Sequence, residues 1–329
     1  MSRLLIFNPE HDYALAHAGA YYIPPLSVRN LTSHLWMLPQ IWGDKKDLIL
    51  TPDNKFVTCC DISSEVQEEP LSLVSLIEPW GWDMALRHRL LSLGICEELL
   101  PADEDIKLLR EISHRRISII FNKRLGTDLI PCEFNDLGNA MEFALSHPDC
   151  YFKLPWSSGG RGVVATRELS SRQISEWVSG GIKKQGSVIG EVGVERSIDF
   201  ASLWEVKNNR VFFEGMSVSS SDGRGKYDGN FYGPQEQMIK YIYAKAQNFT
   251  MDIIDCQKEI IAELIAPCYS GKLGIDMMGD IKGKIYPCVE MNIRRTMGHV
   301  AFDFHKLPEE KIKKLSLNPF LPLIPLAAS

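Results

Sequence analysis

The sequence has no long apolar run, since none of its hydrophobic stretches approaches the roughly twenty residues that a membrane-spanning helix needs. The first residues, MSRLLIFNP, carry too short an apolar run before Asn8 and Pro9 to form the core of a secretory signal. Basic residues do not dominate either, because 36 Lys and Arg stand against 42 Asp and Glu, a formal net charge of −6. We therefore expect a globular cytoplasmic protein that binds neither membranes nor nucleic acid.

Paired cysteines and the common glycine motifs for nucleotides are also missing. The eight cysteines include no C-x-x-C pair, and the adjacent Cys59 and Cys60 would point to opposite faces of a strand. This spacing argues against a structural zinc site and favours free intracellular thiols. No G-K-[ST] follows a glycine loop and no G-x-G-x-x-G follows the first strand, which argues against a Walker-type NTPase and a Rossmann dinucleotide enzyme.

Short apolar runs alternate with helical patterns through the first hundred residues. Residues 3–8 and 47–52 have the composition of strands, whereas residues 28–42 and 82–94 carry the periodicity of helices. Alternating strands and helices predict a small parallel α/β lobe over residues 1–110.

The rest of the chain divides into two α+β units. Residues 111–190 alternate helices and strands around a loop rich in Ser and Gly, and residues 191–329 contain long paired strands. In the second unit we expect one long helix over residues 236–266. The Ser-, Gly- and Asp-rich residues 217–230 predict a loop.

The loop in "KLPWSSGGRGVV", residues 153–164, follows a lysine at the end of an apolar strand. Because glycine lacks a Cβ, the backbone can bend tightly and bring its N–H groups to a polyanion such as phosphate. The candidate phosphate-binding residues are Lys153, Ser157, Ser158, Gly159, Gly160 and Gly162. A Ser/Gly cluster between two strands is also an ordinary hairpin connection, so the loop alone leaves both interpretations open.

A row of polar residues in "VEMNIRR" predicts a metal site. In a strand Glu290, Asn292 and Arg294 project from one face. Turn residues after Asp276 predict a hairpin that places Asp276 opposite Glu290, with Cβ atoms roughly 5 Å apart. Two carboxylates this close repel each other unless a cation lies between them, and their hard oxygen atoms suit Mg²⁺. The alternative is that Asp276 is a turn residue and that Glu290 pairs with Arg294 or Arg295 on an exposed face.

Together these two elements resemble the ATP-grasp superfamily over residues 110–300. "FKLPWSSGGRGV" looks like the superfamily's strand lysine and flexible glycine-rich loop, and "EMNIR" matches its E-x-N-x-R pattern. The resemblance implies the ATP-grasp fold, in which two α+β subdomains clasp ATP, preceded here by the α/β lobe. It also implies that Lys153 binds phosphate and that Arg294 contacts phosphate or acyl phosphate, which makes these two the catalytic residues. The implied ligands of Mg²⁺, or alternatively Mn²⁺, are Asp276, Glu290 and Asn292.

Two further segments match the superfamily by position. Before its first helix the superfamily has a lysine, followed later by a glycine, and Arg115 takes the lysine's place before Gly126. The superfamily's hinge has a glutamate, three residues whose backbone contacts adenine, and an acidic residue for the ribose. In "GEVGVERSIDFA" these are Glu191, Val192 to Val194, and Asp199, with Glu195 as the alternative ribose ligand.

The resemblance implies a ligase that uses ATP and Mg²⁺ to convert a carboxylate into an acyl phosphate, which an amine or a thiol then attacks. The expected partners are small-molecule or peptide carboxylates and amines, and the sequence identifies neither; it also does not indicate the oligomeric state. A small-molecule kinase and a non-catalytic nucleotide-binding module of the same fold are the alternatives. The arginine at position 115 keeps the second alternative open.

Three other features leave two interpretations each. Trp156 either stacks on a ligand or packs against the base of its own loop. His299 either reaches the acceptor substrate or caps the following helix. Glu10, His11 and Asp12 follow the first strand, where α/β lobes bind ligands, and either contact a substrate or form a polar turn.

Overall fold

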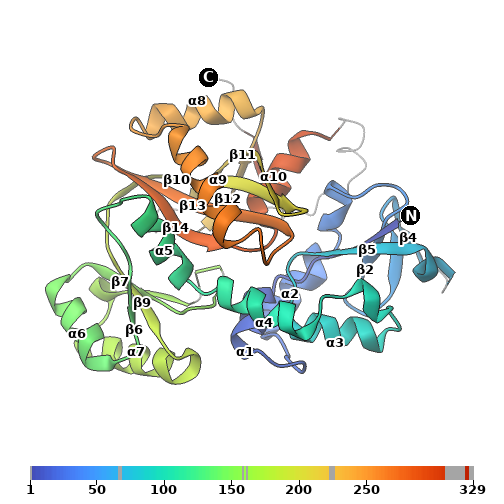
Figure 1. Ribbon diagram of the computed structural model, residues 1–329, viewed down its shortest axis with the longest axis horizontal. Helices are drawn as coiled ribbons and strands as arrows, with labels where there is room; N and C mark the ends of the chain where they lie inside the picture. Colours follow the sequence, from blue (N-terminus) through green and yellow to red (C-terminus); the bar gives the residue numbers. More distant parts are fainter. Residues whose placement is uncertain are drawn as a thin grey trace.

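The computed structural model describes residues 2–65, 69–157, 159–160, 162–221, 227–307 and 323–325, without the side chains of residues 61–65, 69–70 and 221. Ser158 of the predicted phosphate loop therefore lies outside the described residues. Within the described residues the strands form three sheets, and Figure 1 shows each of them in a lobe of its own.

The first lobe is built on a five-stranded sheet in the order β4–β3–β2–β1–β5. β1 pairs in parallel with β2 and β5, as the alternating pattern predicts, and β3 and β4 extend the sheet as antiparallel strands that the pattern did not reveal. The strands are β1 (Ser2–Ile6), β2 (Leu48–Leu50), β3 (Phe56–Thr58), β4 (Asp61–Glu65) and β5 (Val74–Pro79). The helices are α1 (His11–His17), α2 (Leu26–Leu35), α3 (Met84–Ser92) and α4 (Asp103–Ile112), with 3₁₀ helices at Leu38–Ile41, Glu69–Leu73 and Glu97–Leu99.

The second sheet is small and antiparallel, in the order β6–β9–β7–β8. Its strands are β6 (Cys132–Phe134), β7 (Cys150–Lys153), β8 (Val163–Ala165) and β9 (Val188–Val192). α6 (Leu137–Ser146) and α7 (Ser171–Gln185) bury their apolar sides against it, and a 3₁₀ helix spans Thr166–Glu168. α7 begins where Ser170 and Gln173 form a capping box and ends at Gly186, whose positive φ favours glycine.

The third sheet is the largest, in the order β14–β13–β10–β11–β12–β15. Its strands are β10 (Arg196–Lys207), β11 (Arg210–Ser221), β12 (Tyr227–Tyr232), β13 (Gly271–Asp280), β14 (Ile285–Asn292) and β15 (Leu323–Pro325). α8 (Gln235–Lys245) and α9 (Asp252–Leu264) share the main hydrophobic core with one face, and α5 (Arg116–Arg124) packs against β14. α10 (Met297–His305) crosses the opposite face over Leu203 and Ser217. That second face also carries the predicted metal residues.

Two sequence predictions in this lobe are wrong. The helix predicted over residues 236–266 is two helices, because Phe249 leaves helical geometry to pack edge-on against Phe200, 5.3 Å between ring centroids, and Asn248 donates to the Gly283 carbonyl. Most of the loop predicted at 217–230 is strand, since β11 continues to Ser221 and β12 begins at Tyr227; residues 222–226 lie outside the described residues. In both places tertiary pairing outweighs local composition.

The predicted division into residues 1–110, 111–190 and 191–329 stays a prediction. The first sheet lies within residues 1–110 and the third within residues 191–329, whereas β9 of the second sheet runs past residue 190 to Val192. α5, however, belongs to the second range by sequence and lies on the sheet of the third, where Ile117 and Phe121 join its core. The second and third ranges are therefore packed together at this helix.

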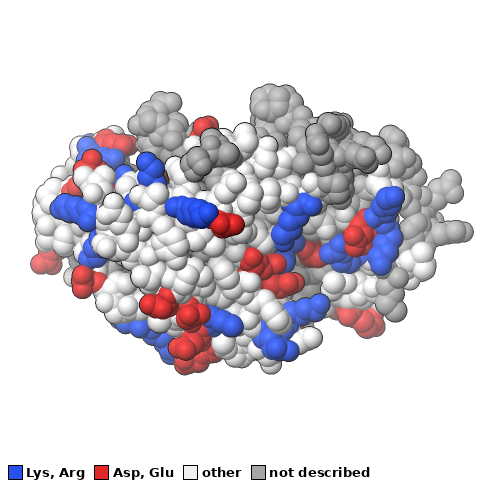
Figure 2. All heavy atoms as spheres, turned by 90° about the horizontal axis from the view of Figure 1, so that it is seen from above, with Lys and Arg blue, Asp and Glu red and all other residues white. Residues whose placement is uncertain are grey.

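Charges of both signs are mixed on one face of the molecule. Figure 2 shows this face, on which Lys and Arg side chains are interspersed with Asp and Glu side chains rather than gathered into one basic area. Of the helices in the described part of the chain, none combines the length and the apolar character needed to cross a membrane.

Candidate functional site

Lys153 ends β7, and Glu191 lies on the neighbouring strand β9. The register pairs Tyr151 with Glu191, which makes Lys153 and Glu191 diagonal neighbours on one face of the small sheet. Lys153 is buried, and its Nζ lies 2.5 Å from Glu191 Oε2. The residues predicted for phosphate and for the hinge therefore meet as an ion pair.

The glycine-rich loop connects β7 and β8 as a hairpin, so the hairpin interpretation holds for its topology. Gly159 and Gly160 have φ of 61° and 73°, in the left-handed region that favours glycine. A Cβ on Gly162 would lie 2.3 Å from Ser157 Oγ, and the Gly162 carbonyl accepts from the Leu154 N–H at 2.7 Å. The loop is thus closed at its base by Ser157 and Gly162, in a conformation that requires its glycines.

Asp276 on β13 lies directly opposite Glu290 on β14 in the antiparallel register, as predicted. Burial, with the charge of Glu290 added, raises the pKa of Asp276 to about 7. Asn292 Nδ2 donates to Asp276 Oδ2 at 2.9 Å. Among the described residues no three His, Cys, Asp or Glu side chains gather as metal ligands. The two carboxylates and the amide oxygen nevertheless fit Mg²⁺, which completes its shell with water and phosphate oxygens.

Arg294 continues this row toward the first lobe. Its Nη2 donates to Asn292 Oδ1 at 2.9 Å, and its Nε donates to Asp12 Oδ2 at 2.9 Å. Asp12 lies in α1, which follows the carboxyl end of β1. Burial alone would raise the pKa of Asp12, but the neighbouring Arg294 outweighs burial and holds that pKa below its usual value. The sequence pointed to this acidic residue after the first strand, though not to Arg294 as its partner.

Arg115 precedes α5 and is 6% exposed. Its Nη1 donates to the Leu154 carbonyl at 2.5 Å and to Ser157 Oγ at 2.7 Å. Its Nη2 donates to the Ser157 carbonyl at 3.3 Å and to Glu290 Oε1 at 2.6 Å. Nε, also buried, has no hydrogen-bond partner among the described residues. Arg115 thus lies where the predicted nucleotide and metal residues meet.

The predicted hinge begins with the last two residues of β9, Glu191 and Val192, and continues beyond the strand. Gly193 donates to the Asp149 carbonyl at 2.8 Å, and a Cβ there would lie 2.8 Å from the Asp149 carboxyl carbon. Of the two ribose candidates, Asp199 is near enough to Asp276 to contribute to its raised pKa, whereas Glu195 is exposed. The geometry therefore groups Asp199, and not Glu195, with the metal residues.

Two open alternatives are resolved by packing. Trp156 is 5% exposed, and its ring lies against the Arg110 guanidinium, 3.8 Å from the ring centroid, and against His114. Trp156 therefore packs at the base of the loop. His299 is buried, and its Nδ1 accepts from the Thr296 N–H at 3.2 Å at the start of α10, so His299 caps the helix.

His11 and Asp83 form a second buried polar pair in the first lobe. His11 Nδ1 lies 3.9 Å from Asp83 Oδ2, and Asn8 donates to the same oxygen at 3.2 Å. Burial lowers the pKa of His11 to about 4 and raises that of Asp83 to about 7. Glu10 takes the N-cap position of α1, and His11 and Asp12 begin that helix, which brings Asp12 to Arg294.

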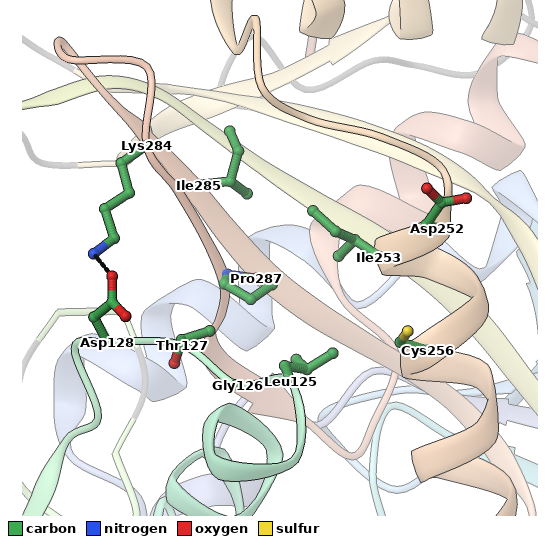
Figure 3. A pocket seen from close by; sticks show the side chains of 10 residues that line it. All are labelled: Leu125, Gly126, Thr127, Asp128, Asp252, Ile253, Cys256, Lys284, Ile285 and Pro287. Atoms are coloured by element: carbon green, nitrogen blue, oxygen red, sulfur yellow. Dashed lines mark hydrogen bonds and ion pairs between the residues drawn. The ribbon is translucent and has the colours of Figure 1, made fainter.

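Two cavities lie beside these residues rather than among them. One, of about 320 Å³, opens between the end of α5, α9 and β14, where Lys284 and Asp128 form an ion pair 2.9 Å long (Figure 3). The other, of about 540 Å³, borders the base of the glycine-rich loop at Trp156 and Gln185. Neither contains Lys153, Asp276 or Glu290 in its lining.

No protein-family model matches the sequence, and no curated protein matches it either. Solved structures do match. D-alanyl-alanine synthetase A from Vibrio cholerae is similar over 97% of this chain and 95% of its own, with a TM-score of 0.53 and 12% identity. The biotin carboxylase domain of a 2-oxoglutarate carboxylase from Hydrogenobacter thermophilus, solved with MgADP and bicarbonate, is similar over 94% of this chain and 72% of its own, with a TM-score of 0.50 and 14% identity. Both are ATP-grasp enzymes.

The chain has the ATP-grasp fold. The small and the large sheet are the two α+β lobes of this fold, and the predicted fold class is confirmed. A biotin carboxylase from Campylobacter jejuni matches 70% of the chain at 13% identity and a TM-score of 0.49, and the chain spans about half of it, 51%. In the ATP-grasp arrangement Lys153 and Glu191 come from the small sheet, and Asp276 and Glu290 from the large one.

Proposed function

We propose that the protein is an ATP- and Mg²⁺-dependent ligase that phosphorylates a carboxylate substrate and passes the acyl group to an amine, or to a thiol. The observation that carries the proposal is the hydrogen-bonded row from Asp276 through Asn292 and Arg294 to Asp12, with Glu290 opposite Asp276. This row supplies oxygen ligands beside a buried guanidinium, and phosphoryl transfer needs both to neutralise charge.

The nucleotide is proposed to lie between the two ATP-grasp lobes. Lys153 neutralises phosphate charge, and the backbone N–H groups of Ser157, Gly159, Gly160 and Gly162 cover the β- and γ-phosphates. Hinge and ribose contacts come from Glu191, Val192, Val194 and Asp199. Arg115 belongs to the same site, but its bonds point to a different role, described below.

Asp276, Glu290 and Asn292 are the side chains that would hold Mg²⁺. The ion would neutralise charge on the β- and γ-phosphate oxygens. Arg294 stabilises the negative charge on the migrating phosphoryl group and on the acyl oxygen of the substrate. ATP and the acid give ADP and an acyl phosphate; the amine then forms the new C–N bond, loses a proton, and releases inorganic phosphate.

Small-molecule acids and amines are the proposed substrates. The name of the Vibrio cholerae protein, a D-alanyl-alanine synthetase, is that of an enzyme joining amino acids. The row ending in Arg294 and Asp12 places a cation and an anion beside each other at the edge of the first lobe, where a small acid would enter.

The test is ADP release with Mg-ATP and pools of amino acids and small carboxylic acids, with and without amines and thiols. Hydroxylamine is added in parallel, because it converts an acyl phosphate into a hydroxamate. A ligase gives ADP that depends on the acid, and a hydroxamate in place of the amide. Lys153→Met should abolish both, whereas Lys107→Met, on the exposed side of α4, should abolish neither. Absence of ADP and hydroxamate with every pool would contradict the proposal.

The non-catalytic alternative has one observation in its favour, since both terminal amino groups of Arg115 are already bonded to protein atoms. It predicts that Mg-ATP binds without forming ADP under any substrate pool. The kinase alternative predicts acceptor-dependent ADP without hydroxamate. The same experiment therefore separates the three functions.

A further inference from the structure

The base of the glycine-rich loop, residues 154–157, is held by a hydrogen bond to each of its four carbonyl groups. The Leu154 and Ser157 carbonyls accept from the Arg115 side chain, and the Pro155 carbonyl accepts from the Arg115 backbone N–H at 3.2 Å. The Trp156 carbonyl accepts from Gln185 Nε2 at 3.1 Å. Arg115 therefore supplies the donors for three of the four carbonyls.

The same guanidinium also holds the metal site. Arg115 Nη2 lies 2.6 Å from Glu290 Oε1, on the far side of the site from the loop. Burial would lower the pKa of Arg115, but the charge of Glu290 outweighs it and raises that pKa, so the guanidinium stays charged. One side chain thus bridges the loop base on the small sheet and a metal carboxylate on the large sheet.

The loop base is fixed from its other side as well. Gln185 Oε1 accepts from the Trp156 N–H at 2.9 Å, and its Nε2 donates to the Trp156 carbonyl. The side-chain amide of Gln185 therefore bonds both backbone groups of Trp156. The Trp156 ring donates its Nε1–H to the Arg110 carbonyl at 2.9 Å. Arg110 in turn donates to the Leu15 carbonyl of α1 at 2.7 Å. The loop base is therefore an anchored segment.

These bonds explain an arginine at position 115. A planar guanidinium can serve several acceptors in fixed directions, whereas the ammonium of lysine is a compact point charge with no such fork. A phosphate that bound both terminal amino groups of Arg115 would have to displace Leu154, Ser157 and Glu290. Nε has no partner among the described residues, but it is buried, and a fork that used it would still have to displace an acceptor from one terminal amino group. The bonds therefore favour retention of the protein acceptors.

We propose that Arg115 is a positioning residue, which fixes the loop base against Glu290, and is not a phosphate ligand. The proposal rests on the nucleotide site proposed above. It assigns the task of phosphate recognition to Lys153 and the loop backbone, and it makes the geometry of the metal carboxylate depend on the loop base. It also makes Arg115 a competitor of any cation at Glu290 Oε1.

Three measurements on the full chain test the proposal. The first is the ratio of the dissociation constants of adenosine and ADP, by calorimetry, which reports the contribution of the phosphates. The second is hydrogen exchange at the Leu154 and Trp156 amides, which reports the loop base. The third is the affinity for Mn²⁺ alone, by electron paramagnetic resonance, which reports the freedom of Glu290. The variants are Arg115→Lys, Arg115→Met and Lys153→Met, with Ser157→Ala removing only one acceptor of Arg115.

We expect Lys153→Met to lower the adenosine-to-ADP ratio about tenfold or more, since a charge-assisted phosphate contact is lost. Both Arg115 variants should keep this ratio within about threefold of wild type. Both should speed exchange at the loop base about tenfold or more, with a smaller effect in Ser157→Ala. Arg115→Met should also tighten Mn²⁺ binding, because Glu290 loses its competing cation; a merely structural role would not produce this effect.

The opposite pattern would overturn the proposal. If Arg115→Met lowers the ratio as Lys153→Met does while Arg115→Lys restores it, then Arg115 is a phosphate ligand. Wild-type exchange at the loop base in both Arg115 variants, or unchanged Mn²⁺ affinity in Arg115→Met, would also contradict the positioning role. If Arg115→Met does not fold, hydrogen exchange at the loop base in Arg115→Lys and Ser157→Ala tests the positioning role instead. A wild-type protein that prefers ADP no more than adenosine would instead overturn the nucleotide site itself, a result distinct from all of these.

Discussion

Arg294 and Asp12 form an ion pair, with Arg294 Nη2 2.8 Å from Asp12 Oδ2, between residues that lie 282 positions apart in the chain. Their side chains are 11% and 16% exposed. The pair joins the end of β14 to α1 and so connects the first lobe to the proposed site of phosphoryl transfer. A pair this deeply buried is costly to break on one side only, because the remaining charge loses its partner.

We therefore expect Asp12→Asn and Arg294→Gln each to lower the free energy of unfolding by about 2–4 kcal/mol. The double variant should lose less than the sum of the two, with an interaction free energy of about 1–3 kcal/mol. Urea unfolding of the four proteins measures the cycle. Strictly additive losses would show that the two side chains do not interact in solution.

Substitution of Glu290 tests the proposed metal site. Glu290→Gln removes the negative charge but keeps an oxygen that can accept from Arg115 Nη2. We expect Mn²⁺ affinity in the presence of ADP to fall by about tenfold or more, since Mg²⁺-type sites depend on carboxylate oxygens. Glu259→Gln, on the exposed side of α9, is the matched control and should leave the affinity unchanged. Equal Mn²⁺ affinity in wild type and Glu290→Gln would exclude Glu290 as a ligand.

Asp83 predicts a pH dependence of stability. It caps α3 by accepting from the Leu86 N–H at 2.8 Å, and burial raises its pKa to about 7, above the value of about 4 that an exposed aspartate has in the unfolded chain. The folded protein therefore holds the proton more tightly. The contribution of the protonated group to stability is complete below about pH 4 and is lost as the pH rises through about 7.

Asp83→Asn keeps a good helix cap and removes the titration. The free energy of unfolding of wild type relative to this variant should fall by about 2 kcal/mol between pH 5 and pH 8. His11 faces Asp83 but has its pKa lowered to about 4, so it stays neutral in the folded protein over this range. Chemical denaturation at several pH values measures the difference, and a pH-independent difference would show that Asp83 is ionised in the fold throughout.

Local patterns in the sequence were sufficient to predict the hairpin of β13 and β14, which carries the proposed metal ligands. Alternation places Glu290 and Asn292 on one face, and the turn after Asp276 sets the register, so the opposition of Asp276 and Glu290 follows from residues close in sequence. The β7 lysine and the left-handed glycines of its loop follow from equally local features. The fold class was recognisable because these two elements occur together.

Contacts between distant segments were not predictable in this way. Nothing near Arg115 in the sequence indicates that its guanidinium meets both Ser157 and Glu290, because those contacts depend on how two sheets approach each other. The break between α8 and α9 has the same origin, since Phe249 leaves the helix to pack against Phe200, which is distant in the sequence. Helical periodicity continues through the break, and packing overrides it.

The small sheet offers a matched test of its packing with two glycines. Gly190 lies in β9, between β6 and β7, and a Cβ there would lie 2.7 Å from the Phe134 ring and 3.0 Å from the Phe143 ring. We expect Gly190→Ala to lower the free energy of unfolding by about 1–3 kcal/mol, because the two rings are packed against each other, 5.2 Å between centroids, and must shift.

Gly180 lies in α7 of the same lobe and has a helical backbone. Among the described residues, no heavy atom outside the backbone of α7 and the two chain neighbours lies within 4 Å of the methyl group that an alanine there would add. Gly180→Ala should therefore raise the free energy of unfolding by about 0.5–1 kcal/mol, since alanine is the better helix former. Thermal and urea unfolding of both variants gives the two changes in one experiment. Because both variants replace glycine by alanine, opposite signs of the change in the free energy of unfolding reflect the surroundings of the added methyl group. A Gly190→Ala variant that is more stable than wild type would contradict the close packing of Phe134 and Phe143 around Gly190.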